Sequence, residues 1–162
     1  RSRATAWPAR SGKCWTRDGY LYIEDERFAY NLDLRQVGPL FKTMPALDKQ
    51  WRIWADSSRP ETVGYLAHQD GGGFNIASAP KWPGSVEDGI EFIRSFKKVI
   101  IHPRCKNTIY EFGAYSYKVD RLTGDILPIV VDAHNHMIDS IRYALNPLIQ
   151  RHATIYDAGI IR

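Results

Sequence analysis

The strand-to-helix junction at residues 126–145 constrains this chain more than any other stretch. Residues 126–131 are short, β-branched and almost wholly apolar, which predicts a buried strand that ends at Asp132. A helix is predicted next, and His136 and Asp139 lie three residues apart on its polar face, near its start. The junction therefore joins a strand end that carries an acid to a helix start, which favours phosphate through its dipole and unpaired amides.

The predicted helix has two chemically different faces. Its apolar stripe consists of Met137, Ile138, Ile141, Ala144, Leu145 and Leu148. Its polar face consists of His136, Asp139, Ser140 and Tyr143. Because a solvated helix face is polar as well, the pattern alone leaves two interpretations open, a plain solvated surface and a site for metal or phosphate.

Composition sets the class of protein only broadly. The chain has 162 residues, of which 44% are hydrophobic and 25% are charged, as expected for about one globular domain. Its formal net charge of +4 favours polyanionic partners without establishing one. Cys14 and Cys105 lie far apart in sequence and indicate neither a disulfide framework nor a structural zinc site. Since no apolar run approaches membrane-spanning length, we expect no membrane partner.

Strands and helices are predicted to alternate after a basic, irregular segment at residues 1–18. We expect strands at 20–30, 51–55, 74–78 and 98–102, a hairpin over 115–127, and helices at 33–44, 58–69, 85–96 and 103–114. This order indicates an α/β domain with a mixed sheet flanked by helices. We assign that domain to residues 1–147 and interpret residues 148–162 as a C-terminal extension on the surface.

Three sequence patterns predict helix starts. Asp33 gives the first helix an acidic start. The pattern Ser58-x-x-Glu61, with Pro60 between the two, is typical of a capping box, and a further helix is predicted to start at Ser85-x-x-Asp88.

Two further expectations concern burial. Ile109 and Phe112 are predicted to face inward from the helix at 103–114. Glu24, Asp25 and Glu26 alternate between the two faces of a strand, so we interpret them as a solvated edge and leave them out of the site.

Several segments resemble one known family. Residues 135–145, with Asn-His-x-x-Asp followed by Ile-Arg-Tyr-Ala-Leu, are similar to the closing motif of the nuclease domain of tailed-bacteriophage terminase large subunits, which are DNA-packaging motors. Residues 51–61, a strand that ends in Ala-Asp-Ser before Pro-Glu, resemble a second motif of that family. Further similarity lies in Lys81 with 83–90, in 101–105 and in 115–120, so that the resemblance covers roughly residues 20–147 in order.

The resemblance implies a ribonuclease-H-like fold and a divalent-metal-dependent DNA endonuclease that cuts concatemeric viral DNA at the initiation and termination of packaging. Asp56 and Asp139 match the family's metal-binding catalytic acids, and Mg²⁺ or Mn²⁺ is the expected ion. Such ions prefer hard oxygen ligands, and a pair of them can activate water and absorb the charge of the leaving oxygen. Asp132 is a third candidate metal ligand that fits a helix cap equally well.

The roles of three other residues follow from the same motifs. His136 is expected to act in catalysis, by accepting Mn²⁺, by orienting the water or by contacting the scissile phosphate. Lys81 and Arg104 are expected to be the cations nearest the DNA, although a solvated surface is the usual place for a lysine. Phosphate contacts of this kind would be non-specific and salt-dependent.

The sequence departs from the family in one respect. The family's first catalytic aspartate lies on its first strand, whereas residues 1–17 contain no acid. We expect that the chain begins just downstream of that aspartate, so that the site within it is incomplete. The ATP-binding half of a terminase would be marked by a Gly-x-x-x-x-Gly-Lys-Ser/Thr pattern, which does not occur in the 162 residues.

The resemblance also implies partners. Double-stranded DNA, a terminase small subunit and the portal ring are expected to bind, in the cytoplasm of the host. Two alternatives remain open at this stage, a non-catalytic module that docks DNA or the portal, and another ribonuclease-H-like nuclease such as a resolvase.

Overall fold

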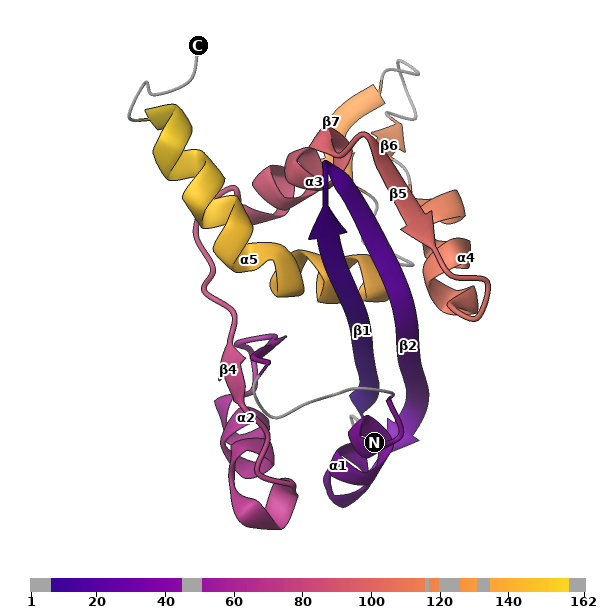
Figure 1. Cartoon of the computed structure of the whole chain (residues 1–162), viewed down its shortest axis with the longest axis vertical. Coiled ribbons are helices and arrows are strands. Elements are labelled where there is room, and N and C mark those ends of the chain that lie inside the picture. Colours follow the sequence, from indigo (N-terminus) through magenta and orange to yellow (C-terminus); the bar gives the residue numbers. More distant parts are fainter. Residues whose placement is uncertain (1–6, 45–50, 116, 120–125, 131–134, 158–162) are drawn as a thin grey trace.

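The computed structural model describes residues 7–44, 51–115, 117–119, 126–130 and 135–157. A long hairpin of β1 (Trp7–Arg17) and β2 (Tyr20–Leu32) lies at its centre (Figure 1). The hairpin turns at Asp18 and Gly19, whose φ angles of 54° and 81° suit a two-residue turn. β5 (Lys98–Ile101) pairs in parallel with β2, so this sheet is mixed, as predicted.

The expectation of an irregular segment at residues 1–18 is wrong. Residues 7–17 form β1, which pairs antiparallel with β2 along most of its length, with register shifts after Trp7 and Lys13. The segment contains Pro8 and Gly12, which weaken the local strand signal. Pairing with β2 therefore determines the conformation here more than local propensity does.

The other elements surround this hairpin. β3 (Ile53–Ala55) and β4 (Ile76–Ser78) form a parallel pair, and β6 (Tyr117–Val119) and β7 (Ile126–Val130) form the predicted hairpin. The helices are α1 (Leu34–Lys42), α2 (Pro60–Ala67), α3 (Ser85–Ser95), α4 (Lys106–Ala114) and α5 (His136–Asp157), with a short 3-10 turn, η1, at Gln69–Gly71. None of the described helices is long and apolar enough to span a membrane.

α5 connects the parts of the fold. It contacts β1, β3, α3 and α4, and Figure 1 shows it bending along its length. Pro147 lies inside it and cannot donate the helical hydrogen bond to residue 143. The helix continues beyond the predicted domain boundary at residue 147, and Ile149 is buried in the core rather than on the surface. The domain assignment itself stays a prediction.

Two groups of apolar residues form the core. The larger one includes Leu21 and Ile23 of β2, Ile93 of α3, and Ile141 and Leu145 of α5. A smaller group joins α1 to α2 and consists of Val37, Phe41, Leu66 and Phe74. Four residues of the predicted apolar stripe of α5 are buried, namely Met137, Ile138, Ile141 and Leu145, whereas Leu148 is exposed.

The predicted inward face of α4 is only partly correct. Phe112 packs against the core, but Ile109 is exposed. Thr108 and Glu111 are the buried residues of this helix, at 0% and 4% exposure. These two buried side chains are polar because each forms hydrogen bonds at a helix start. Thr108 donates its hydroxyl to Glu26 at the start of α4, and Glu111 accepts from amides at the start of α5.

The helix starts predicted at Asp33 and at Ser85 are confirmed, whereas the capping box predicted at Ser58 is wrong. Asp33 caps α1 as expected, by accepting a hydrogen bond from the amide of Arg35. α2 and α3 begin after Arg59 and Gly84, neither of which caps its helix with a side chain. Ser58 instead donates to Asp56.

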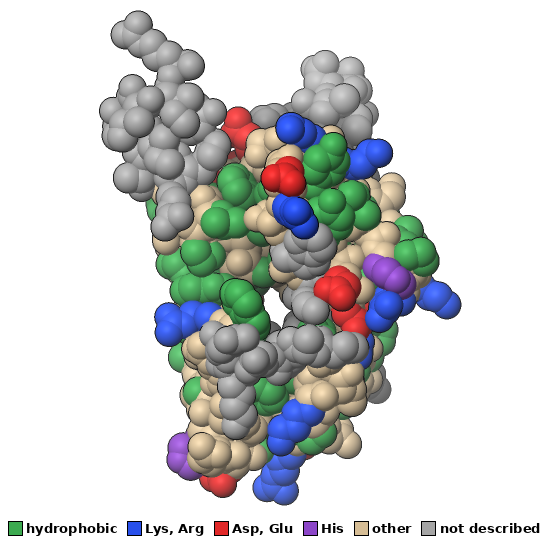
Figure 2. All heavy atoms as spheres, viewed as in Figure 1, with side chains coloured by type: hydrophobic (Ala, Val, Ile, Leu, Met, Phe, Trp, Pro, Cys, Tyr) green, Lys and Arg blue, Asp and Glu red, His purple; other side chains and the backbone are tan. Residues whose placement is uncertain are grey.

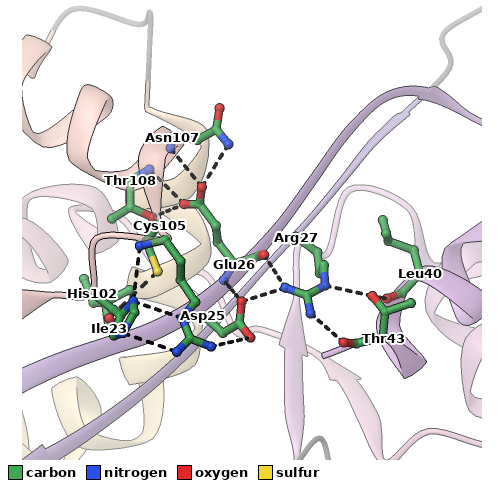
Figure 3. A network of polar contacts seen from close by, with 11 residues as sticks. Ile23, Asp25, Glu26, Arg27, Leu40, Thr43, His102, Cys105, Asn107 and Thr108 are labelled. Atoms are coloured by element: carbon green, nitrogen blue, oxygen red, sulfur yellow. Dashed lines mark hydrogen bonds and ion pairs between the residues drawn. The ribbon is translucent and has the colours of Figure 1, made fainter. Parts of the chain in front are cut away.

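Asp25 and Glu26 are buried, so the interpretation of this stretch as a solvated edge is wrong for both (Figure 3). Glu26 accepts hydrogen bonds from the amides of Asn107 and Thr108 at the start of α4, and from the side chains of both. Asp25 accepts from Arg27 at 2.6 Å. The start of α4 lies against Glu26, and two arginines, Arg27 and Arg104, lie against Asp25. Alternation along the strand alone does not reveal these partners.

Gly71 permits a close approach of backbone segments, and its substitution tests the packing of η1 on α2. A Cβ atom at residue 71 would overlap the carbonyl oxygen of Tyr65, whereas one at Gly64, within α2, would meet nothing within 4 Å. We expect Gly71→Ala to lower the free energy of unfolding by about 1–3 kcal/mol. Gly64→Ala, the control, is expected to raise it by about 0.5–1 kcal/mol. Urea unfolding measures both, and equal effects would contradict the described packing.

Candidate functional site

Asp56 and Lys81 meet at the carboxyl ends of two parallel strands. Asp56 directly follows β3, and Lys81 comes three residues after β4. The ammonium Nζ of Lys81 donates to Oδ1 of Asp56 at 2.5 Å. Ser58 adds its amide at 3.1 Å and its hydroxyl at 3.0 Å. This end of a parallel strand pair is where open α/β sheets gather functional groups.

These donors set the charge state of Asp56. Partial burial alone would raise the pKa of its carboxyl group, but the hydrogen bonds from Lys81 and Ser58 outweigh it and hold the pKa below its ordinary value. Burial alone would likewise lower the pKa of Lys81, yet Asp56 and Tyr143 raise it. The pair is therefore an ion pair at neutral pH.

Asp139 lies in the first turn of α5 and is held by a different cation. Its amide donates to the carbonyl of Asn135 at 2.8 Å, as the first helical turn requires. Its Oδ1 accepts two hydrogen bonds from Arg142, at 2.7 and 3.2 Å. Arg142 is buried and also donates to the carbonyl of Ser85, which ties α5 to the start of α3.

Tyr143 lies close to the cation of each of these two ion pairs. Burial raises the pKa of the Tyr143 hydroxyl, and the negative charges of Asp56 and Asp139 raise it further. The Nζ atom of Lys81 lies 5.7 Å from the centre of its ring, and the guanidinium carbon of Arg142 lies 5.6 Å from it. Two carboxylates that are far apart in sequence therefore act on one hydroxyl.

A cavity of about 330 Å³ lies beside this group. Its lining includes Lys81, Trp82, Tyr115, Asp139, Arg142 and Tyr143. The lining thus combines charged side chains of both signs with aromatic rings.

The other predicted site residues lie elsewhere or outside the described residues. His136 is the first residue of α5 and is exposed. Asp132 falls outside the residues that the structure describes. Arg104 contacts His102, with its Nε 2.9 Å from Nδ1, and lies 3.9 Å from the carboxylate of Asp25 (Figure 3). Among the described residues, no group of three or more His, Cys, Asp or Glu side chains is placed to hold a metal ion.

Among the described residues, the face of the molecule in Figure 2 has no single cluster of positive charge. In Figure 2, Lys and Arg side chains are scattered over the face in view, with acidic side chains between them. At the site itself, the Lys81 side chain is 43% exposed.

Sequence reasoning missed Arg142 and Glu111. Arg142 follows Asp139 by three residues, a helical spacing that brings the two side chains together and could have indicated the pair. Glu111 accepts hydrogen bonds from the amides of Met137 and Ile138. These partners lie at least 26 residues away, so no local pattern would have revealed them.

Comparison with known proteins identifies a family. The family model described as "Terminase RNAseH like domain" matches residues 46–147. The PBSX phage terminase large subunit of Bacillus subtilis (strain 168) is 32% identical over 127 residues, which is 78% of this chain and 28% of that protein. The terminase large subunit of Bacillus phage SPP1 is 32% identical over 129 residues, which is 79% of this chain and 30% of that protein.

Solved structures agree on the fold. The nuclease domain of the g2p large terminase from bacteriophage SPP1, solved with bound Mn, superposes with a TM-score of 0.73 at 30% identity, covering 84% of this chain and 75% of that one. The large terminase of a thermophilic bacteriophage superposes with a TM-score of 0.66 at 18% identity, over 90% of this chain and 38% of that one. These matches confirm the predicted ribonuclease-H-like fold. The chain spans less than a third of the length of the two curated relatives.

The ion pair at Asp56 can be tested by titration. We expect Lys81→Met to raise the pKa of Asp56, because the substitution removes a hydrogen bond and a positive charge that stabilise the carboxylate while leaving its partial burial. The stability that depends on ionised Asp56, which is present above its unfolded pKa and lost as pH falls, would shrink accordingly. NMR titration of the aspartate carboxyl carbons measures the shift. Lys98→Met, on an exposed position of β5, is the control, and an unchanged pKa in Lys81→Met would refute the pairing.

Proposed function

Because this chain belongs to the family of terminase ribonuclease-H-like domains, we propose that it is the metal-dependent DNA endonuclease domain of a viral terminase large subunit. Its task would be to cut concatemeric DNA at the initiation and termination of genome packaging by hydrolysis of phosphodiester bonds. The observation that carries this proposal is the arrangement around Tyr143: Lys81, which pairs with Asp56, and Arg142, which pairs with Asp139, both lie near its ring, beside a cavity that Asp139 lines.

The chemistry of the two acids suits Mg²⁺ or Mn²⁺. Asp56 and Asp139 come from separate elements, and each is already paired with a cation, so a divalent ion would share these carboxylates with Lys81 and Arg142 or replace them. Hard divalent ions prefer carboxylate oxygens and complete their shell with water. The SPP1 nuclease domain was solved with bound Mn, which supports a divalent ion here. Asp132 would be a third ligand.

The residues of this chain would divide the work of hydrolysis. Divalent ions bound by Asp56 and Asp139 would supply an activated water and neutralise the leaving oxygen. Lys81 is half exposed and would turn its ammonium to a phosphate oxygen. His136, exposed at the start of α5, would orient the attacking water or contact the scissile phosphate.

Contacts with DNA phosphates other than the scissile one would come from individual basic side chains. Arg104 is about half exposed and follows β5, so it is proposed to contact a phosphate further along the duplex. In the cytoplasm of the host, a terminase small subunit and the portal ring are the proposed partners of the whole motor. Double-stranded DNA is the proposed substrate.

Metal binding is the direct test of the site. We expect the wild-type chain to bind Mn²⁺ and each of Asp56→Asn and Asp139→Asn to weaken binding by at least about tenfold, since each removes a charged oxygen ligand. Electron paramagnetic resonance of free Mn²⁺ measures the affinity. Asp70→Asn, which changes an exposed carboxylate in η1, is the control. Unchanged affinity in both site variants would exclude the proposed metal site.

DNA binding should depend strongly on salt. We expect the affinity for duplex DNA to fall by at least about tenfold between roughly 50 and 200 mM salt, because phosphate contacts release counterions. Lys81→Met should lower the slope of log affinity against log salt by about one. Lys42→Met, which changes an exposed residue of α1, should leave the slope unchanged. Fluorescence anisotropy measures the slopes. Salt-independent binding would contradict phosphate-based recognition.

A further inference from the structure

Glu111 of α4 is a buried acid whose partners belong to the start of another helix. Its exposure is 4%, and a carboxylate at such a depth is costly unless strong donors satisfy it. Oε2 of Glu111 accepts the amide of Met137 at 2.6 Å and the amide of Ile138 at 3.2 Å. These are the second and third residues of α5, whose amides have no partner within their own helix.

The amides that Glu111 binds belong to the same helical turn as the proposed metal ligand. Asp139 follows Ile138 directly and continues the turn through its bond to the carbonyl of Asn135. The side chains of Met137 and Ile138 are buried at 0% and 4% exposure, so the opposite face of this turn is packed. Glu111 and this packing therefore hold the backbone from which the Asp139 side chain extends.

The helix that carries Glu111 is itself held in place. Glu26 of β2 binds the amides of Asn107 and Thr108, the second and third residues of α4, in the same manner (Figure 3). Two buried glutamates thus link β2 to α4 and α4 to α5. The central sheet is connected in this way to the first turn of α5.

We propose that Glu111 is a positioning residue for Asp139, which fixes the first turn of α5 so that the Asp139 carboxylate is presented to a divalent ion. This inference rests on the proposed function. Glu111 acts through the backbone of α5 and is no ligand itself, because the amides of Met137 and Ile138 occupy its Oε2. An ordinary stabilising residue would change the melting temperature alone, whereas a positioning residue also changes the metal affinity of a correctly folded chain.

The test compares Mn²⁺ affinity in Glu111→Leu, Asp139→Asn and the double variant. We expect Glu111→Leu to weaken Mn²⁺ binding by about tenfold, the effect typical of residues that orient a metal ligand. In the Asp139→Asn background the same substitution should have no further effect, because the residue through which Glu111 acts is already changed. Electron paramagnetic resonance of free Mn²⁺ measures each affinity, and hydrogen exchange at Met137 and Ile138 should accelerate in Glu111→Leu.

The control is Leu66→Ala, which removes a buried side chain of the smaller core group, a group that includes no residue of α4 or α5. It should lower the melting temperature and leave Mn²⁺ affinity unchanged. If Glu111→Leu does not fold, Glu111→Gln decides, since its neutral oxygen accepts more weakly and should weaken Mn²⁺ binding by about threefold.

Three results would overturn the inference. Wild-type Mn²⁺ affinity in a folded, less stable Glu111 variant would leave Glu111 with a structural role only. Equal effects of Glu111→Leu in the wild-type and Asp139→Asn backgrounds would show that it does not act through Asp139. A wild-type chain that binds no Mn²⁺ would overturn the proposed function together with this inference.

Discussion

The arrangement of α4 and α5 depends on carboxylates buried against helix starts. Glu26 accepts four hydrogen bonds from the second and third residues of α4, and Glu111 accepts two from the corresponding residues of α5. Charge on the acceptor strengthens each bond and also complements the positive end of the helix dipole. A glutamate without these donors would be an uncompensated buried charge, which typically costs about 3–5 kcal/mol. The helices and the acids therefore determine one another's positions.

The same stretch of β2 also holds the end of α1. Arg27 donates to the hydroxyl of Thr43 at 2.8 Å and to its carbonyl oxygen, just beyond the last residue of α1. The carboxylate of Glu26 thus lies at the start of α4, where the helix dipole is positive, and the guanidinium of Arg27 lies at the end of α1, where it is negative. Asp25 lies between these contacts and binds Arg27 at 2.6 Å. Neighbouring residues of opposite charge consequently orient α4 and α1 from a single strand segment.

Features of the structure could be predicted where the interacting residues lie close together in sequence, and were missed where they lie far apart. The periodic stripe of α5, the acidic start of α1 at Asp33 and the candidate acids Asp56 and Asp139 rest on local patterns or short motifs, and the elements were found where expected. The strand β1 was missed because its conformation comes from pairing with β2. Glu111 was missed because its partners are remote. Ser58 was misassigned as a cap because a nearby carboxylate, Asp56, competes for its hydroxyl.

The two cations of the candidate site are suited to different tasks. Arg142 is 6% exposed, and its planar guanidinium is held by both Asp139 and the carbonyl of Ser85, so its position is fixed by the fold. Lys81 is 43% exposed and has a flexible stem, and its ammonium forms an ion pair with Asp56. A fixed guanidinium can orient Asp139 without leaving it, whereas a mobile ammonium can exchange a carboxylate for a phosphate of similar charge. The geometry therefore separates a guanidinium that the fold holds in place from an ammonium that is exposed and held by a single ion pair.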